Sequence, residues 1–313
     1  MSNVSMVMEF LLLGFSEVQE LQLVHAALFL LFYLVALTGN LLIVTITALD
    51  QHLHTPKDFF LRHLSLLDLC NITTTVPKSI LNSSLTNSRS ISFQGCTTQV
   101  FLLILFGGSE VFILTAMSYD RYAAICCPLR YDIIMNREGC AKMAAASWLS
   151  GSLYSLMHTA TTFSSHFCAP HIIHQFFCEL PQFLKLMCPG EARAEVCVPV
   201  LSVILCLGCF VFILVSYVHI FLVVLKMPST EGRTKAFSTC LPHLAVVTLY
   251  FFTSVFANLK PPSSSPSTLD LLLSVFYTVL PPTLNPLIYS LRNQDMKAVL
   301  GKIFSVHFIS GVH

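Results

Sequence analysis

The chain has 313 residues, of which 55% are hydrophobic and only 11% carry a formal charge, and its net charge is +1. Soluble domains usually contain about 25% charged residues, so this chain has too little polar side-chain surface to cover a water-soluble globule. Its seventeen Lys and Arg residues are scattered, which excludes the basic stripe typical of nucleic-acid-binding proteins. The composition predicts a protein that is solvated by lipid.

Seven apolar stretches follow one another along the sequence, and a helix that crosses a bilayer needs about 20 such residues. The second stretch, residues 63–77, is short, but Arg62 and Lys78 can snorkel at its ends. Within the apolar parts of the second and third stretches the only charged residues are Asp68 and Glu110. We expect helices at residues 21–49, 58–80, 90–120, 140–163, 196–225, 236–259 and 270–291. The sequence thus predicts an all-α membrane protein whose residues 1–313 form one domain, a seven-transmembrane helix bundle.

The distribution of basic residues predicts the orientation of this bundle. Twelve of the seventeen Lys and Arg residues lie in alternate connecting segments, and segments rich in Lys and Arg stay on the cytoplasmic side. The basic segments are residues 50–62, 120–142, 226–235 and 292–313. We therefore expect an extracellular tail at residues 1–20, with the N-terminus outside, and a cytoplasmic C-terminal tail at residues 292–313.

Two kinds of residue on the expected outer side indicate an extracellular environment. Asn3, in Asn3-Val4-Ser5, matches the N-glycosylation pattern. Four of the twelve cysteines also fall on this side, where oxidising conditions favour disulfides over free thiols. They are Cys96, Cys168, Cys178 and Cys188. A zinc site from His166, His171, His174 and Cys178 is an alternative, but no C-x-x-C pair supports it, so we predict disulfides and no metal.

Asp68 and Glu110 are acidic residues expected deep inside the bilayer, where a charge costs about 2.5–3.5 kcal/mol on insertion scales and usually faces the protein interior. Glu110 precedes Arg121 by eleven residues, almost three turns of about 3.6 residues. Both side chains should therefore lie on the inner face of the third helix. One hypothesis is a cation or proton site shared by Asp68 and Glu110. The alternative is a neutral, hydrogen-bonded carboxylic acid.

Prolines within the last predicted helix indicate a kink. Pro281, Pro282 and Pro286 interrupt it, and Asn285 and Tyr289 flank the last of them. Proline removes a backbone hydrogen bond and bends a membrane helix where neighbouring groups satisfy the freed carbonyl. Together with the buried acids, such a hinge favours a bundle that switches between two conformations.

Five motifs in order carry a resemblance to a known family. Gly39-Asn40, LHTPKDFFLRHLSLLD at 53–68, MSYDRYAAICCPLRY at 117–131, KAFSTCLPHL at 235–244 and PPTLNPLIYSLRN at 281–293 all lie in or beside predicted helices. The chain resembles a rhodopsin-like G-protein-coupled receptor, and specifically an odorant (olfactory) receptor, from about residue 10 to about residue 303. It departs from the family pattern at several positions. These are Lys57-Asp58, Arg62-His63, Cys127, Pro242 and Asn258.

The resemblance implies roles for individual residues. Disulfides Cys96–Cys178 and Cys168–Cys188 would tie the outer loop over the pocket. Asp120 would hold Arg121 until activation, when Arg121 turns toward a G protein of the olfactory stimulatory type, which raises cyclic AMP. The other residues of this G-protein-coupling switch would be Tyr122, Tyr217, Asn285, Pro286 and Tyr289. No cofactor and no enzymatic activity are expected.

A ligand would bind between the third, fifth, sixth and seventh helices, in their outer halves. On the third helix we expect Leu103, Ile104, Gly107 and Gly108, with Gly107 leaving space in the wall and Gly108 packing against a neighbouring helix. The resemblance adds Leu201, Ser202, Phe251, Ser254, Val255, Asn258, Val275 and Thr278. A mostly apolar cavity with a few hydroxyl groups suits a small volatile molecule.

Two other functional classes fit the composition less well. A proton-coupled transporter would use Asp68 and Glu110, but the two halves of the sequence show no internal repeat of the kind that transporters contain. An intramembrane enzyme would need a catalytic motif, and the sequence contains no H-E-x-x-H or G-x-S-x-G. The predicted partners are therefore an odorant, a heterotrimeric G protein and the lipid of the plasma membrane.

Overall fold

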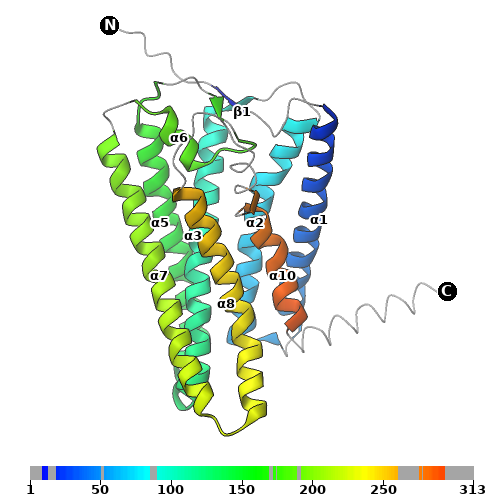
Figure 1. The fold of residues 1–313 in the computed structure, drawn as a ribbon, viewed down its shortest axis with the longest axis vertical. Helices are drawn as coiled ribbons and strands as arrows, with labels where there is room; N and C mark the ends of the chain where they lie inside the picture. Colours follow the sequence, from blue (N-terminus) through cyan, green and yellow to red (C-terminus); the bar gives the residue numbers. More distant parts are fainter. Residues whose placement is uncertain are drawn as a thin grey trace, which may run out of the picture.

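The computed structural model is a bundle of long helices that run roughly side by side, with a small sheet at one end (Figure 1). It describes residues 9–12, 19–50, 53–84, 90–168, 172–173, 175–188, 192–259, 275–276 and 278–292. The long helices are α1 (Gln19–Leu49), α2 (Pro56–Ser84), α3 (Phe93–Cys126), α5 (Arg137–Ser164), α7 (Ala192–Lys226), α8 (Thr230–Leu259) and α10 (Leu280–Arg292). Shorter helical elements are η2 (Pro128–Arg130), α4 (Tyr131–Ile134) and α6 (Leu180–Leu186).

Several helices extend beyond the lengths expected from the apolar stretches. α3 continues past residue 120 to Cys126, and α8 begins at Thr230 rather than residue 236. Charged residues are unfavourable only within the hydrocarbon, so a helix can continue into water with Arg121 or Lys235 on its surface. α3 ends where Pro128 restricts the preceding residue.

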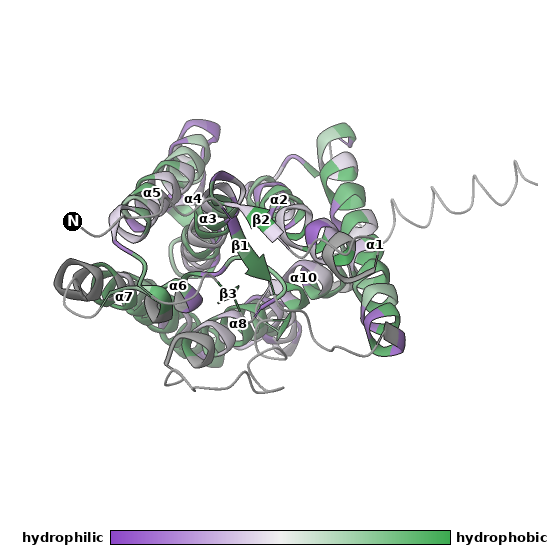
Figure 2. Cartoon of the chain, turned by 90° about the horizontal axis from the view of Figure 1, so that it is seen from above, coloured by the Kyte–Doolittle hydropathy of each residue, from purple (hydrophilic) through white to green (hydrophobic). Residues whose placement is uncertain are grey.

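Four helices of the described part are long and apolar enough to cross a membrane. They cover Glu20–Leu49, Phe93–Cys126, Val200–Lys226 and Thr230–Val255. Hydrophobic residues recur along all the long helices (green in Figure 2). Many of them are exposed, for example Val24, Ile204 and Leu225, which are 57%, 59% and 62% exposed. Such a surface is stable in lipid and not in water.

The structure is mostly helical, as the all-α prediction requires, but one end of the bundle carries a small sheet that was not predicted. Three short strands form a sheet in the order β2-β1-β3, from β1 (Glu9–Leu12), β2 (Ser90–Ser92) and β3 (Ile172–Ile173). β1 pairs antiparallel with β2 and parallel with β3. Its alternate side chains, Phe10 and Leu12, are buried, so a part of the expected N-terminal tail is integrated into the fold.

Helices α3 and α5 are in especially close contact, and a glycine makes this possible. A Cβ added to Gly151 of α5 would lie 2.8 Å from the Ser109 amide nitrogen and 2.9 Å from the Leu105 carbonyl oxygen. Small residues allow helix backbones to approach in this way inside membranes. Next to it, Gly108 faces the Tyr154 ring of α5, with 3.2 Å from an added Cβ to Cδ1, so Gly108 serves packing, as expected.

Candidate functional site

Two disulfides mark the end of the bundle that carries the sheet, called the disulfide end below. The structure joins Cys96 to Cys178 and Cys168 to Cys188, with Cα–Cα distances of 5.6 and 4.9 Å. Both pairings are those that the resemblance implied. Asn3, the expected glycosylation site, lies outside the described residues.

The segment next to Cys178 is held by hydrogen bonds as well as by the disulfide. The Gln99 side chain of α3 accepts from the Cys178 amide at 3.0 Å and donates to the Thr74 carbonyl of α2 at 2.9 Å. The Ser79 hydroxyl donates to the Phe176 carbonyl at 3.1 Å. Gln99 thus connects α2, α3 and the loop, and the loop closes over the helix ends.

The expected ligand-binding residues are divided among several environments. Leu103 and Val275 pack against the cluster that contains Phe176 and Phe177, whereas Ile104 packs against the cluster around Phe10. Thr278 is buried beside the first of these clusters, and its hydroxyl makes no hydrogen bond to a described residue.

On α7 and α8, most of the expected residues are buried or half-buried among other side chains. Ser202 is buried and hydrogen-bonds His158 of α5, and Phe251 stacks on Phe210 with ring centroids 3.9 Å apart. Ser254 and Val255 are half-buried on α8, and the side chain of Asn258 lies outside the described ones.

Two expectations about the pocket wall need correction. Leu201 is 43% exposed on the outer surface of α7. Consecutive residues of a helix point in different directions around its axis, so Leu201 faces outward although its neighbour Ser202 faces inward. Gly107 does not simply leave space. The Tyr250 hydroxyl of α8 donates to the Gly107 carbonyl at 3.0 Å and would lie 3.1 Å from an added Cβ.

Midway along the bundle, Asn285 of α10 joins the two buried acids. Its side-chain nitrogen donates to both carboxyl oxygens of Asp68, at 3.3 and 3.0 Å, and to Glu110 Oε1 at 3.4 Å. Asp68 and Glu110 are 0% and 1% exposed. The described part of the chain contains no group of three or more His, Cys, Asp or Glu side chains that could hold a metal ion.

Pro286 is accommodated by the Gly39-Asn40 pair of α1. Proline cannot donate to the carbonyl four residues earlier, which here is that of Pro282. The Asn40 side chain donates to this carbonyl at 2.8 Å. A Cβ on Gly39 would lie 2.9 Å from Pro286 Cβ, so only glycine permits the close approach.

At the opposite end, called the Arg121 end, the expected Asp120–Arg121 pair is weak. The closest nitrogen–oxygen distance is 3.9 Å. Asp120 instead accepts a hydrogen bond of 2.8 Å from the Tyr131 hydroxyl of α4. Burial, and then the Asp120 carboxylate, raise the pKa of Tyr131 above its ordinary value, so the phenol stays a donor at neutral pH. Tyr122 packs with its ring 6.2 Å from His219 of α7.

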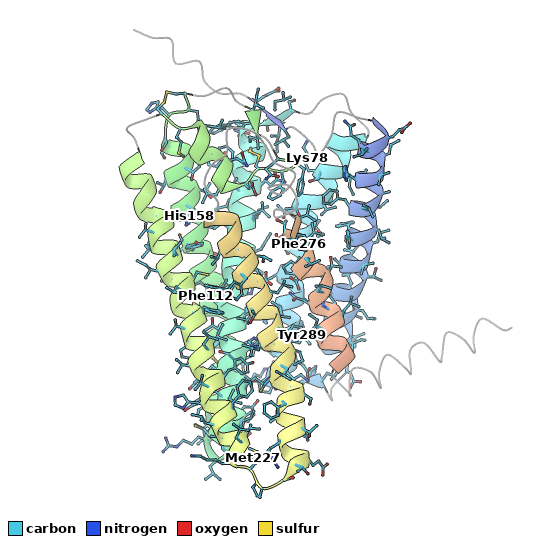
Figure 3. The ribbon with its side chains drawn as sticks, in the orientation of Figure 1. Lys78, Phe112, His158, Met227, Phe276 and Tyr289 are labelled. Atoms are coloured by element: carbon cyan, nitrogen blue, oxygen red, sulfur yellow. A yellow bond between two sulfur atoms is a disulfide. The ribbon has the colours of Figure 1, made fainter. Side chains whose placement is uncertain are left out.

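Tyr217, His243 and Tyr289 form a buried polar group above Arg121. The Tyr217 hydroxyl and His243 Nδ1 are 2.7 Å apart. His243 Nε2 and the Tyr289 hydroxyl make no hydrogen bond to a described residue. Arg121 is near enough to interact electrostatically with both His243 and Tyr289. Figure 3 places Tyr289 on α10, facing the bundle.

Sequence reasoning missed four contributors. Tyr131 and His243 lie inside the quoted motifs, so their positions were visible, but their partners are distant in sequence. Leu129, on η2, is 97% exposed, and Ile133, on α4, is 75% exposed. In the sequence, Leu129 and Ile133 could have been noticed as large apolar residues within a connecting segment that otherwise contains charged residues.

Comparison with known proteins gives a consistent result. A family model described as "Olfactory receptor" matches residues 29–307. Olfactory receptor 14A16 of Homo sapiens is 53% identical over 303 residues, which are 97% of each chain. Olfactory receptor 14L1 of Homo sapiens is 54% identical over 298 residues, covering 95% of this chain and 91% of that one. Olfactory receptor 1G1 of Gorilla gorilla gorilla is 44% identical over 307 residues, 98% of each chain.

Proposed function

Because the chain belongs to the olfactory receptor family, we propose that it binds small volatile odorants at the disulfide end and activates a G protein of the olfactory stimulatory type, which raises cyclic AMP. Members of this family are multi-pass receptors of the plasma membrane that couple to G proteins, and they are not enzymes. Transport and intramembrane catalysis are therefore set aside.

The proposed orientation puts the N-terminus and the disulfide end outside the cell and the Arg121 end in the cytoplasm. Two features support it. Disulfides persist in the oxidising extracellular space, and both occur at one end. Arg121, Arg130 and Arg137 follow one another at the other end, as the excess of basic residues on cytoplasmic segments requires.

The proposed odorant site lies beneath the loop that carries Phe176 and Phe177. Leu103 packs against the cluster of these rings from α3, and Val275 packs against it from the segment before α10. The Thr278 hydroxyl is buried and makes no hydrogen bond to a described residue, so it is a candidate to bind the polar group of the odorant. An odorant with a hydrocarbon body and one hydrogen-bonding group fits such a site best.

The observation that carries the proposed mechanism is the loose contact of Arg121. At 3.9 Å from Asp120 and with 15% of its side chain exposed, Arg121 has no short hydrogen bond to a described residue that would have to break before it turns. Tyr289 has a buried hydroxyl without a described partner, and leaving such a group unpaired costs about 1–3 kcal/mol. Movement of α10 that gives Tyr289 a partner would therefore favour the active conformation.

The exposed apolar side chains of Leu129 and Ile133 form the proposed contact surface for the G protein. Both lie directly after the helix that carries Arg121, and both are mostly exposed. A large apolar side chain that protrudes from a polar cytoplasmic loop is typical of a binding anchor. Tyr131, between them, holds this segment to Asp120.

For the buried acids we propose a shared proton rather than a bound cation. Two adjacent carboxylates repel one another, and a proton held between them removes the repulsion. The Asn285 side-chain nitrogen already donates to both, and a cation would compete with this N–H donor for the same oxygens. Sodium should then have little effect on signalling, and a strong sodium dependence that Glu110→Gln removes would favour the cation instead.

The test of the whole proposal is a cyclic AMP assay in cells that display the chain at their surface, with a panel of odorants. We expect at least one odorant to raise cyclic AMP. Arg121→Ala should abolish this response while surface delivery, measured by antibody labelling, stays unchanged. Full signalling by Arg121→Ala would refute the role of Arg121, and transport of a substrate without cyclic AMP would refute the receptor mechanism.

A further inference from the structure

An open groove of about 780 Å³ lies between α2, β2 and α3 at the disulfide end. None of the residues assigned above to the odorant site lines it. Its wall includes Thr73 and Thr98, which are exposed on the outer surface of the bundle. In a membrane-spanning receptor this surface contacts lipid, so the groove opens to the bilayer and not to the odorant site.

The groove has the length of one lipid leaflet. On α3 its lining extends from Gly95 to Phe106, and eleven residues of helix at 1.5 Å each measure about 16 Å. The hydrocarbon core of a bilayer is about 30 Å thick. The groove therefore reaches from near the membrane surface to about the middle of the bilayer.

Its polarity changes along this length. Leu69, Leu102 and Phe106 line the part nearest the middle of the bundle, whereas Ser90, Ser92 and Lys78 line the part at the disulfide end. α2 and α3 run in opposite directions, so residue 78 of one helix and residue 95 of the other lie at the same end. The groove is apolar where a hydrocarbon chain would lie and polar where a head group would lie.

Lys78 is a single cation at the polar mouth of this groove. Figure 3 shows it near the disulfide end of α2, and it is half-buried. No ion pair joins it to an acidic residue of the described segments. A lysine in this position buries its hydrocarbon stem and keeps its ammonium group near the head-group region, where an anion is its natural partner.

The floor of the groove is rigid. Gln99 lines it and is fixed by its hydrogen bonds to the Thr74 carbonyl and the Cys178 amide, at 2.9 and 3.0 Å. A preformed groove binds a ligand without first having to order its own walls.

We propose that this groove is a second binding site, for a fatty acid whose carboxylate pairs with Lys78 and whose chain contacts Leu69, Leu102 and Phe106.

A fatty acid fits better than an uncharged lipid because it has one chain and one negative charge. The groove has space along two helices for a chain of one leaflet's length and has one cation at its mouth. A helix from a second copy of the protein would also cover the groove, but it would leave the Lys78 ammonium without a counter-charge.

The test uses the purified receptor in phosphatidylcholine nanodiscs, without odorant or G protein. Dodecanoic acid with a photoreactive diazirine at the end of its chain is the probe, and unlabelled dodecanoic acid displaces it to give an affinity. We expect the label on the α2 and α3 peptides that contain Leu69 and Phe106. Because hydrogen bonds between charged groups are stronger than neutral ones, Lys78→Gln should weaken binding roughly tenfold.

Two variants and one ligand serve as controls. Thr98→Trp, at an exposed position of the wall, should block the groove and abolish labelling. Lys142→Gln removes the same charge from an exposed pair with Glu138 on α5 and should leave binding unchanged. Dodecanol should bind about as weakly to the unchanged receptor as dodecanoic acid binds to Lys78→Gln.

Equal binding of acid and alcohol, or no effect of Lys78→Gln, would overturn the assignment of Lys78. Labelling spread over the exposed faces of α1 and α7 would overturn the groove itself. Since neither measurement uses signalling, the result is independent of whether the proposed odorant response is found.

Discussion

The hydrogen bond from Tyr131 to Asp120 should decide whether the short helix α4 stays docked on α3. Tyr131→Phe removes one hydroxyl and keeps the ring that packs against the main core. The lost bond is 2.8 Å long and ends on a carboxylate with 2% of its side chain exposed. The remaining ionic partner, Arg121, is 3.9 Å away and compensates little.

A hydrogen bond to a charged group contributes ~1.5–3 kcal/mol. Because Tyr131 is half-buried, we expect the lower end of this range, which is roughly a tenfold change in the docking equilibrium. Amide hydrogen exchange measures that equilibrium directly. The amide of Met135, which donates to the Tyr131 carbonyl at 2.8 Å, should exchange about ten times faster in Tyr131→Phe.

The raised pKa of Tyr131 determines at which pH the docking of α4 should weaken. Free tyrosine titrates near pH 10, so below about pH 9 the phenol is protonated in both the docked and the undocked loop, and its own titration adds no pH dependence to docking. Above about pH 10 the undocked loop loses its proton first, and docking weakens. Asp132→Asn, at an exposed neighbour, is the control. Unchanged exchange at Met135 in Tyr131→Phe would refute the reasoning.

Three further changes should have effects of known sign. Gly151→Ala should destabilise the receptor by about 1–3 kcal/mol through overpacking. Its control is Gly208→Ala, which should be neutral or slightly stabilising because nothing lies within 4 Å of an added Cβ. Thermal unfolding in detergent compares the two variants. Asn40→Ala should cost about 1–3 kcal/mol, since the Pro282 carbonyl loses its donor, and an unchanged melting temperature would contradict this. Leu129→Asp should leave the melting temperature unchanged, because the side chain is 97% exposed, and should reduce the cyclic AMP response at equal surface expression.

The helices were predictable from sequence, and their rotation about their own axes was only partly so. Charges are excluded from hydrocarbon, so apolar stretches locate the membrane-embedded part of each helix. In lipid, however, the outer surface of a helix is as apolar as its inner surface, so periodicity gives little information about which side faces in. Leu201 and Ser202 are such a case. Asp68 and Glu110 were placed correctly because a buried charge must face inward.

The sheet could not be predicted for a different reason. Glu9–Leu12 alternates exposed and buried residues, but four residues are too short to indicate a strand, and their partners are Ser90–Ser92 and Ile172–Ile173. Such pairing depends on where the ends of the helices bring the chain. The same applies to Tyr131 and His243, whose motifs were recognisable while their hydrogen-bond partners were not.

The contacts of α10 restrict how the proposed switch can move. Asn40 holds the Pro282 carbonyl on one side of the helix, and Asn285 holds the buried acids on the other. Because Gly39 leaves no space beside Pro286, this segment cannot slide along α1 and can only pivot about it. Tyr289 lies about one turn further on and is buried in the main core. The Tyr289 hydroxyl makes no hydrogen bond to a described residue. The proposed pivot at Pro286 therefore lies next to a side chain that would gain a hydrogen bond if α10 moved.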